Sequence, residues 1–445
     1  MIWVLRDLKN EQYIYVYVHV ARNCILVYPK PITFTLEKST SGVLRWLRSL
    51  GPGMITAALV FGPSKLTITS KMGALYGYSL LWLVVAAIFF MAIFTGMATR
   101  IGGATEQSLL ATVRGKWGNW AGVAMGIGVF LVATSFQAGN SVGVGVAAGE
   151  LFHTSNIPWI IFFNLLAICL LFFRSFYPVL EKTMIFLIVI MLFSFITTFF
   201  NASPDAAEMV KGVVTPQIPA GSTGLIIAFT ASCFSIVGAL YQAYLIQERI
   251  RVNPALKYEK NDSTTGIILL GVMCFIVIVC AAAILKPKGI QVNSASDMAK
   301  ALEPLFGSNA SAVFLIGLFG AAFSSVIGNA SVGGTLLGDA LGLGSNFSSK
   351  QVRYLVALVM VIGASIAVRF GKLPLELIVF AQSVTIFVVP FIGTVMYLVA
   401  NDKKIMGDKV NSTFVKIAAG LGLIIIFSLA VVNSKEIFFN NPLFK

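Results

Sequence analysis

The sequence has 445 residues, of which 57% are hydrophobic and only 11% are charged, and its mean hydropathy is +0.88. These values lie outside the range of soluble domains and indicate a polytopic helical membrane protein. The formal net charge of +14 does not imply nucleic acid as a partner, because basic residues gather in the cytoplasmic loops of membrane proteins. The expected partners are the lipid bilayer and a small solute or ion.

The chain begins with a stretch that does not look like a membrane span. Residues 1–40 carry YIYVYVHVARNCILVYP, an alternating run that His19 and Arg22 interrupt. The run is too short to span a bilayer and lacks the features of a signal peptide, so it predicts either a short strand or an extension without a folding role. We therefore divide the chain into an N-terminal tail (1–43), a membrane domain (44–435) and a C-terminal tail (436–445).

About eleven apolar segments of sufficient length to span a membrane follow the tail. They lie near residues 51–77, 79–99, 119–148, 158–176, 179–201, 222–247, 264–286, 309–339, 351–369, 374–400 and 411–433. When the N-terminus is placed in the cytoplasm, more Lys and Arg fall on the cytoplasmic side than on the other. This bias predicts a multi-pass protein of the cytoplasmic membrane with a cytoplasmic N-terminus and an outside C-terminus.

The first predicted span contains the most informative stretch, in which Gly62-Pro63 interrupts the apolar run and Lys65 follows at once. Proline removes a backbone donor and clashes with the preceding turn, so the helix should break between Phe61 and Ser64. In hydrocarbon, such a break persists only against protein or a solvated cavity. A lysine at this depth is costly and indicates function, although snorkelling to the surface is the alternative.

The sixth predicted span carries small and polar residues at its middle, namely Ser232, Cys233, Ser235 and Gly238. If spans 1–5 and 6–10 form an inverted repeat, this stretch and the break at Gly62-Pro63 face each other at the bilayer midplane. Packing of small residues against neighbouring helices is the alternative explanation. The same explanation is adopted for the glycine pairs at four-residue spacing, such as Gly139/Gly143 and Gly334/Gly338.

Two motifs in the third span suggest other functions but lack the required context. GNSVG (139–143) fits a nucleophile elbow, which needs a strand-to-helix turn and a nearby histidine, yet the chain has only His19 and His153. SVGVG (141–145) is similar to a potassium-filter sequence but lies within a long apolar run. We expect neither an enzyme nor this kind of channel. The five scattered cysteines match no zinc or disulfide pattern and read as small buried hydrophobes, and no cofactor is expected.

Three further stretches are informative: GPGMITAALVFGPSK followed by GALYGYSLLW, then GALYQAYLIQER, and AAFSSVIGNASVGGTLLGDALGLG (321–344). They resemble the Nramp (natural resistance-associated macrophage protein) family of proton-coupled divalent-metal transporters. The resemblance runs from about residue 51 to residue 433. It implies an all-α, leucine-transporter-like fold, with a five-plus-five inverted repeat, one additional helix, and broken first and sixth spans.

Most residue types of the family's metal site are missing from the matching positions of this sequence. Where the family has Asp-Pro-Gly-Asn in the first span, this chain has Gly62, Pro63, Ser64 and Lys65. Where the family has Met-Pro-His in the sixth span, the best alignment gives Ile236, Val237 and Gly238. Gln382 lies within about one residue of the glutamine of the tenth span. At an effective dielectric of ~20, a lysine ~4 Å from a dication repels it by roughly 8 kcal/mol.

The remaining polar residues favour a different cargo. Carboxylates lie near span ends, so the usual proton relay is missing from mid-membrane. Lys65 with amides, hydroxyls and half-helix N-termini suits an anion or a zwitterion better than a cation. Lys65 replacing a coupling cation is an alternative role. The predicted substrate-binding residues are Phe61, Gly62, Ser64, Lys65, Ser232, Ser235, Gly238, Asn329 and Gln382.

The sequence therefore predicts an Nramp-related secondary transporter of a small solute, with selectivity altered from divalent metal. Three alternatives stay open: a genuine metal transporter that uses other ligands, a channel or passive pore, and a transport-inactive binding or sensor protein.

Overall fold

The computed structural model of the chain describes residues 2–6, 14–20, 23–25, 61–105, 107–172, 193–234, 236–252, 264–345, 349–370 and 374–435. The chain divides into two compact units, Met1–Ser49 and Leu50–Lys445. The described part of the first unit is β-sheet, and that of the second is helical.

The first unit contains a three-stranded antiparallel sheet, in which β1 (Ile2–Arg6) pairs with β2 (Ile14–Val20), and β2 pairs with β3 (Asn23–Ile25). Ile2 lies opposite Val18, and Val18 lies opposite Ile25. The β-branched and aromatic residues that alternate along β2 are enriched in strands. Of the two predictions for the tail, the strand is the one that the structure adopts.

The helices of the second unit coincide closely with the predicted spans. The longer ones are α3 (Pro63–Tyr76), α4 (Leu81–Ala104), α6 (Asn119–Leu151), α7 (Asn156–Phe172), α10 (Thr223–Phe234), α11 (Ile236–Val252), α12 (Thr264–Ile284), α15 (Ala310–Ala340), α16 (Lys350–Arg369), α17 (Pro374–Val384), α18 (Val389–Ala400) and α20 (Thr413–Lys435). Short connecting helices are α5 (Leu109–Trp117), α9 (Ala206–Val214), α13 (Ala295–Ala299), η2 (Lys300–Leu302), α14 (Glu303–Phe306), η3 (Gly307–Asn309), η4 (Thr385–Phe387), α19 (Lys403–Met406) and η5 (Gly407–Lys409).

Among the described residues, seven helices are long and apolar enough to cross a membrane, and a bent pair raises the number to eight. That pair joins Ile378–Phe387 to Val389–Ala400 at an angle of 46°, with Pro390 just after the break. The fourth predicted span appears as the shorter apolar helix α7. Residues 51–60 of the first span and 179–192 of the fifth lie outside the described residues, whereas residues 193–201 are helical.

The sixth span consists of α10 and α11, which meet at Ser235, a residue outside the described ones. Together they form one apolar stretch from Thr223 to Glu248. Gly238, which was expected within the break, lies inside α11 and is half-buried. Residues 236–238, which the sequence placed in the predicted interruption, are therefore helical.

The packing of the helices is paired in the manner expected for two related halves. α4, the second span, packs against α11 of the sixth span. Likewise α12, the seventh span, packs against α3 of the first span. In the same way, α6 packs on α7 as α15 packs on α16, and α6 and α15 pack against each other at the centre. An inverted repeat predicts this correspondence, in which each contact of one half has an equivalent in the other half.

Small residues permit the closest of these approaches, as the glycine pairs suggested. A Cβ atom at Gly143 of α6 would lie 2.4 Å from Cγ of Pro63, and one at Gly334 of α15 would lie 2.5 Å from the backbone nitrogen of Val356. Both distances are far below van der Waals contact. Ser141, the central residue of GNSVG, is buried within α6 and donates to Asn164 Oδ1 at 3.1 Å, so its role is in packing between α6 and α7.

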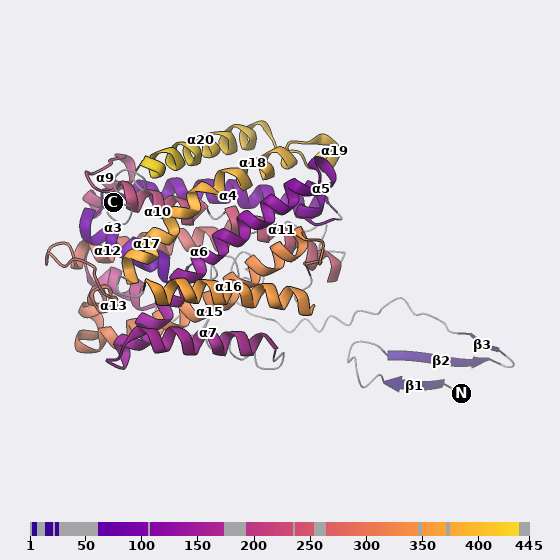
Figure 1. Cartoon of the computed structure of the whole chain (residues 1–445), viewed down its shortest axis with the longest axis horizontal. Helices are drawn as coiled ribbons and strands as arrows, with labels where there is room; N and C mark the ends of the chain where they lie inside the picture. Colours follow the sequence, from indigo (N-terminus) through magenta and orange to yellow (C-terminus); the bar gives the residue numbers. More distant parts are fainter. Residues whose placement is uncertain are drawn as a thin grey trace. The chain divides into compact units, whose positions relative to one another are not determined.

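Polar networks connect the helices at the ends of the bundle. At the end where α5 and α19 lie (Figure 1), Tyr244 of α11 donates to Asp339 of α15 at 2.5 Å, and Arg114 of α5 contacts the same aspartate. Lys116 of α5 pairs there with Asp402, the N-cap of α19. These contacts join the segments after the second, eighth and tenth predicted spans, which lie on one side of the membrane when the spans alternate in direction.

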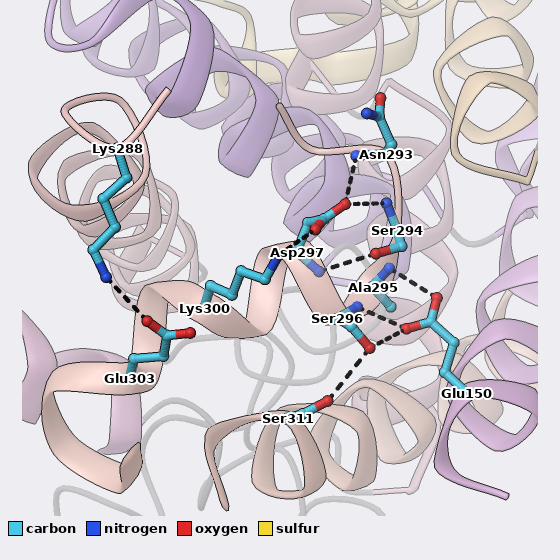
Figure 2. Close-up of polar contacts among 10 residues, drawn as sticks. All are labelled: Glu150, Lys288, Asn293, Ser294, Ala295, Ser296, Asp297, Lys300, Glu303 and Ser311. Carbon is cyan, nitrogen blue, oxygen red and sulfur yellow. Dashed lines mark hydrogen bonds and ion pairs between the residues drawn. The ribbon is translucent and has the colours of Figure 1, made fainter. Parts of the chain in front are cut away.

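At the opposite end of the bundle, Glu150 of α6 holds the connecting helix α13 (Figure 2). Its carboxylate accepts hydrogen bonds from Ala295 N at 3.0 Å, from Ser296 N at 2.7 Å and from Ser296 Oγ at 2.5 Å. Charge-assisted bonds to backbone N–H groups at a helix start are among the stronger protein hydrogen bonds. Glu150, which looked like a carboxylate near a span end, is therefore a structural tether.

A capping box reinforces the same helix start, because Asp297 accepts from the backbone of Asn293 and Ser294 while Ser294 Oγ accepts from Asp297 N (Figure 2). Burial raises the pKa of Asp297, but the hydrogen bonds from Lys300, Ser294 and Asn293 outweigh burial and hold the pKa below its ordinary value. Because the pKa of this carboxyl is lower in the folded protein than in the unfolded chain, the carboxylate stabilises the fold at pH values above its ordinary pKa. This contribution is lost as the pH falls through the pKa of the folded state.

We expect Glu150→Ala to lower the stability of the purified protein by about 2–3 kcal/mol, because it leaves backbone donors without their charged acceptor. The matched control is Glu303→Ala, which removes an exposed ion pair with Lys288 (Figure 2) and should cost about 0–1 kcal/mol. Melting temperatures in detergent compare the two. Equal effects of both substitutions would contradict the assigned tether.

Candidate functional site

The candidate site is built around the start of α3. Pro63 occupies the first helical position, where its missing N–H is tolerated and its fixed φ suits a helix. Gly62 is the N-cap, in extended conformation (φ −101°, ψ −171°), and it supplies no side-chain cap. Phe61 precedes it and is buried. The predicted helix boundary between Phe61 and Ser64 is therefore confirmed on its C-terminal side.

The Lys65 side chain is almost completely buried, with 1% of its surface exposed. Its ammonium donates to Ser232 Oγ at 2.7 Å and to Cys233 Sγ at 2.8 Å, both in the last turn of α10. The same nitrogen lies 5.2 Å from the centroid of the Phe229 ring, which provides a cation–π contact. No carboxylate among the described residues pairs with it within 4.0 Å. Lys65 therefore points into the protein, which rules out the snorkelling alternative.

The bent tenth span contacts the same helix start through Ser64. Gln382 of α17 donates through Nε2 to Ser64 Oγ at 2.9 Å, and both side chains are buried. Gly139 of α6 lies beside this pair, since a Cβ atom there would sit 3.1 Å from Ser64 Oγ. Because Nε2 is held by Ser64, the amide of Gln382 has a fixed orientation. Its carbonyl oxygen Oε1 is buried and has no partner among the described residues.

On another side of the helix start, Gly62 faces α6 and α15. A Cβ atom at Gly62 would lie 2.9 Å from Ser325 Oγ and 3.3 Å from Asn140 Oδ1. Asn140 Nδ2 donates to the backbone oxygen of Ser325 at 3.3 Å. The Ser325 hydroxyl itself has no hydrogen-bond partner among the described residues, although only 1% of the residue is exposed. Gly62, Asn140 and Ser325 thus form a polar junction of three helices.

Asn329, one turn further along α15, belongs to a neighbouring polar group. Its Nδ2 donates to Ala133 O at 2.6 Å and to Gln137 Oε1 at 3.3 Å, both on α6. It makes no hydrogen bond to the α3 start among the described residues. Among the predicted site residues, five are therefore joined by direct contact or through this junction: Gly62, Ser64, Lys65, Ser232 and Gln382. Asn329 lies beside them, and Gly238 lies within α11. Ser235 lies outside the described residues.

Two contacts of Lys65 were absent from the predicted site. Cys233 was interpreted as a small buried hydrophobe, and that interpretation is wrong, because its sulfur accepts from Lys65 and Cys274 of α12 lies close to it. Phe229 contributes its ring face. The available signal was spacing: Ser232 and Cys233 lie three and four residues after Phe229, and residues at these spacings are neighbours on a helix surface.

Several buried polar atoms around this centre have no partner among the described residues. They include Gln137 Nε2, Thr230 Oγ1, Ser325 Oγ and Gln382 Oε1. Buried polar groups in proteins are almost always hydrogen-bonded, so a cluster of unmatched ones calls for an explanation such as a bound molecule. The described residues contain no group of three or more His, Cys, Asp or Glu side chains that could hold a metal ion. The chemistry at the α3 start is that of amides, hydroxyls, one thiol and one ammonium.

Comparison with known proteins places these features in a family context. The family model described as natural resistance-associated macrophage protein-like (Nramp) matches residues 53–434. The divalent metal cation transporter MntH of Chromohalobacter salexigens is 25% identical over 403 residues, covering 88% of this chain and 91% of that protein. MntH of Bacillus subtilis is 23% identical over 415 residues, covering 90% and 95%.

Solved structures give the same result for the fold. The manganese transporter of Eremococcus coleocola, in complex with an aromatic bis-isothiourea substituted compound, superposes with a TM-score of 0.69 at 19% identity, covering 91% of this chain and 90% of that one. MhsT in complex with L-phenylalanine gives a TM-score of 0.59 at 14% identity, covering 85% and 98%. These likenesses confirm the leucine-transporter-like fold expected from the sequence.

A double-mutant cycle tests the contact between Lys65 and α10. We expect Ser232→Ala to cost about 1.5–3 kcal/mol of stability, because it removes an acceptor from a buried charge. In a Lys65→Met background the same change should cost at least about 1 kcal/mol less. Ser331→Ala, which removes a hydroxyl bonded only within its own helix, is the control. An equal cost of Ser232→Ala in both backgrounds, measured by thermal unfolding in detergent, would contradict the contact.

Proposed function

Because this chain belongs to the Nramp family of membrane transporters, we propose that it is a secondary transporter whose cargo is a small anion or zwitterion rather than a bare divalent metal ion. The cargo binds at the start of α3, where Gly62, Ser64 and Lys65 meet α10, α15 and α17.

The single observation that carries this proposal is the environment of Lys65. An ammonium with 1% exposure has lost its hydration, and its hydrogen-bonded partners are a hydroxyl and a thiol, neither of which carries an obligatory negative charge. A buried charge without a counter-ion is strongly unfavourable. An ammonium has three donors, of which two are used here. An anionic group of a cargo molecule supplies both the missing charge and the third acceptor.

The same environment disfavours a dication. Hard cations bind oxygen ligands that carry negative charge, and softer transition metals bind imidazole or sulfur. At the α3 start, the groups that resemble such ligands are the neutral amide oxygen Gln382 Oε1 and the Cys233 thiol, and the thiol already accepts a hydrogen bond from the ammonium. Divalent-metal transport, which is what the names of the relatives state for those proteins, is the second candidate function. It requires Lys65 to leave α10 and Cys233 to become a ligand.

The proposed location is the cytoplasmic membrane, with the N-terminus in the cytoplasm and the C-terminus outside. Arg114 and Lys116 lie at the same end of the bundle as Lys403 and Lys404 of α19, which supports assigning that end to the cytoplasm. Family membership supports transport rather than enzymatic activity.

Flux measurements with purified protein in liposomes distinguish the open mechanisms. Radiolabelled acetate, glycolate, glycine and Mn²⁺ serve as probes in parallel. Saturable uptake that is accelerated by unlabelled solute on the opposite side indicates a transporter. Flux without saturation or exchange indicates a channel, and ligand binding without flux indicates a sensor.

We predict that the dissociation constant for Mn²⁺ at the α3 start is millimolar or weaker, because the ligand types of the family site are replaced and Lys65 repels a dication. Isothermal calorimetry on the purified protein measures this affinity. A micromolar Mn²⁺ affinity that Gln382→Leu or Ser64→Ala abolishes would overturn the proposed cargo class.

For Lys65 itself, we predict that Lys65→Ala abolishes flux of the anionic or zwitterionic probe while the protein stays folded. Stability should be unchanged or higher, because removing an ammonium from an apolar interior removes its desolvation cost. Lys350→Ala, at an exposed position of α16, is the control and should transport normally. Normal transport by the Lys65→Ala protein would show that the ammonium has no role in cargo binding.

A further inference from the structure

We infer that the first turn of α3 binds the carboxylate of a small monocarboxylate, with Ser325 as a hydrogen-bond donor, and that Gln382 selects solutes bearing a hydroxyl or amino group beside that carboxylate. This inference rests on the proposed function and narrows it to a substrate class and a binding pose.

The start of α3 provides the anion-binding end. The first turn of a helix has N–H groups without intrahelical partners and a partial positive charge. Here Gly62 offers no side-chain cap and Pro63 has no N–H, while Lys65 N bonds back to Gly62 O at 3.0 Å. Ser64 keeps its backbone N–H without a backbone acceptor among the described residues. An anion at this position therefore meets the Ser64 N–H and the positive end of the helix dipole together.

Ser325 supplies a second and independent indication of a ligand. It lies midway along the 31-residue helix α15, is 1% exposed, and has a hydroxyl without a partner among the described residues. That hydroxyl is 2.9 Å from the position that a Cβ atom of residue 62 would occupy. It is thus aimed at the α3 start, and the absence of a side chain at Gly62 is what leaves it accessible. A carboxylate oxygen placed there completes the hydrogen bonding of Ser325.

The balance of charge favours a single negative charge on the cargo. Lys65, in the same turn of α3, is the one cation that the described residues bring to this centre. One carboxylate neutralises it in a medium of low dielectric constant, whereas a dianion such as phosphate leaves one negative charge uncompensated. The subsite therefore fits a monocarboxylate better than a divalent oxyanion.

Two acceptor oxygens define the other requirement. Gln382 Oε1 is buried without a partner among the described residues while its Nε2 donates to Ser64 Oγ, so in this orientation the amide presents an acceptor. Asn140 Oδ1 lies 3.3 Å from the Cβ position of residue 62, with its Nδ2 bonded to Ser325 O. These oxygens repel a carboxylate but accept from an O–H or N–H group. A hydroxy acid or an amino acid presents both kinds of group on neighbouring atoms.

Binding measurements on the purified full-length protein test this pose, with acetate, glycolate, glycine and phosphate as probes. Calorimetry gives the affinities, and the melting temperature without ligand checks folding. We expect glycolate to bind at least about fivefold more tightly than acetate, in line with one extra neutral hydrogen bond, and glycine to bind more tightly than acetate through its charged N–H donors. Phosphate should bind more weakly than the preferred monocarboxylate.

Three variants and one control locate the subsite. Ser325→Ala should weaken all three monocarboxylates by about tenfold, the usual effect of losing a hydrogen bond to a charged group. Gly62→Ala should do at least as much, because its Cβ fills the space in front of Ser325. Gln382→Met should remove most of the preference for glycolate or glycine while leaving acetate binding nearly unchanged. Gly96→Ala is the control, since nothing lies within 4 Å of a Cβ atom there, and it should bind like the wild type.

The outcomes separate this inference from the proposed function. If a monocarboxylate binds and Lys65→Ala abolishes binding, but Ser325→Ala and Gly62→Ala bind like the Gly96→Ala control, the pose is overturned and the proposed cargo class stands. Binding of none of the anions to the wild type overturns both. Ser325→Ala deletes a hydroxyl without a partner and should melt like the wild type, so it decides the question even if Gly62→Ala fails to fold.

Discussion

The feature on which this structure most depends is the enclosed ammonium of Lys65. It draws the last turn of α10 onto the first turn of α3, because Ser232 and Cys233 provide its acceptors and Phe229 covers it with a ring face. Each of these contacts compensates part of the lost hydration, and none supplies a full counter-charge. The first and sixth spans are therefore held together in part by an interaction that lacks a counter-charge. Under the proposed function, an anionic cargo that replaces the acceptors of α10 changes the contact between the two spans, and this couples binding to motion.

The distribution of the other charges fits this arrangement. Carboxylates and guanidinium groups join the helices at the two ends of the bundle, through Asp339, Tyr244 and Arg114 at one end and Glu150 with α13 at the other. In the middle, α6, α15 and α17 present amides and hydroxyls. Ion pairs at the ends can exchange partners with water when the helices move, whereas amides in the centre need fixed partners or a ligand. The unmatched atoms of Ser325 and Gln382 lie in this central region.

Much of the helical framework could be predicted from hydrophobicity alone. The apolar run at 309–339 became α15 (Ala310–Ala340), and proline chemistry placed the start of α3 at Pro63. These features are local, since they depend on the length of an apolar run or on one missing N–H. The inward direction of Lys65 was also predictable, because hydrocarbon is a worse environment than a polar contact for an ammonium far from both ends of its span.

The partners of individual side chains were harder to predict, because they depend on the rotation of each helix about its axis. Asn329 and Ser325 are one helical turn apart on α15, yet Asn329 bonds to Ala133 and Gln137 of α6 while Ser325 faces Gly62. Cys233 was misread because a thiol in an apolar run usually behaves as a hydrophobe, and only the arrival of a lysine from a segment 168 residues away gives it a polar role. Sequence patterns indicate which residues share a face, but not which face a neighbouring helix presents.

Fold and selectivity are set by different parts of this chain. The backbone superposes on a manganese transporter at 19% identity, because close glycine contacts and apolar faces determine how the spans pack. The sign of the charge that the centre can hold is determined by a few side chains at the start of α3. A negatively charged ligand side chain there makes room for a cation, and an ammonium tethered at the same place excludes one by several kcal/mol. Under the proposed function, substitution within one helical turn inverts the preferred charge of the cargo while the helices, their contacts and the end networks keep the same architecture.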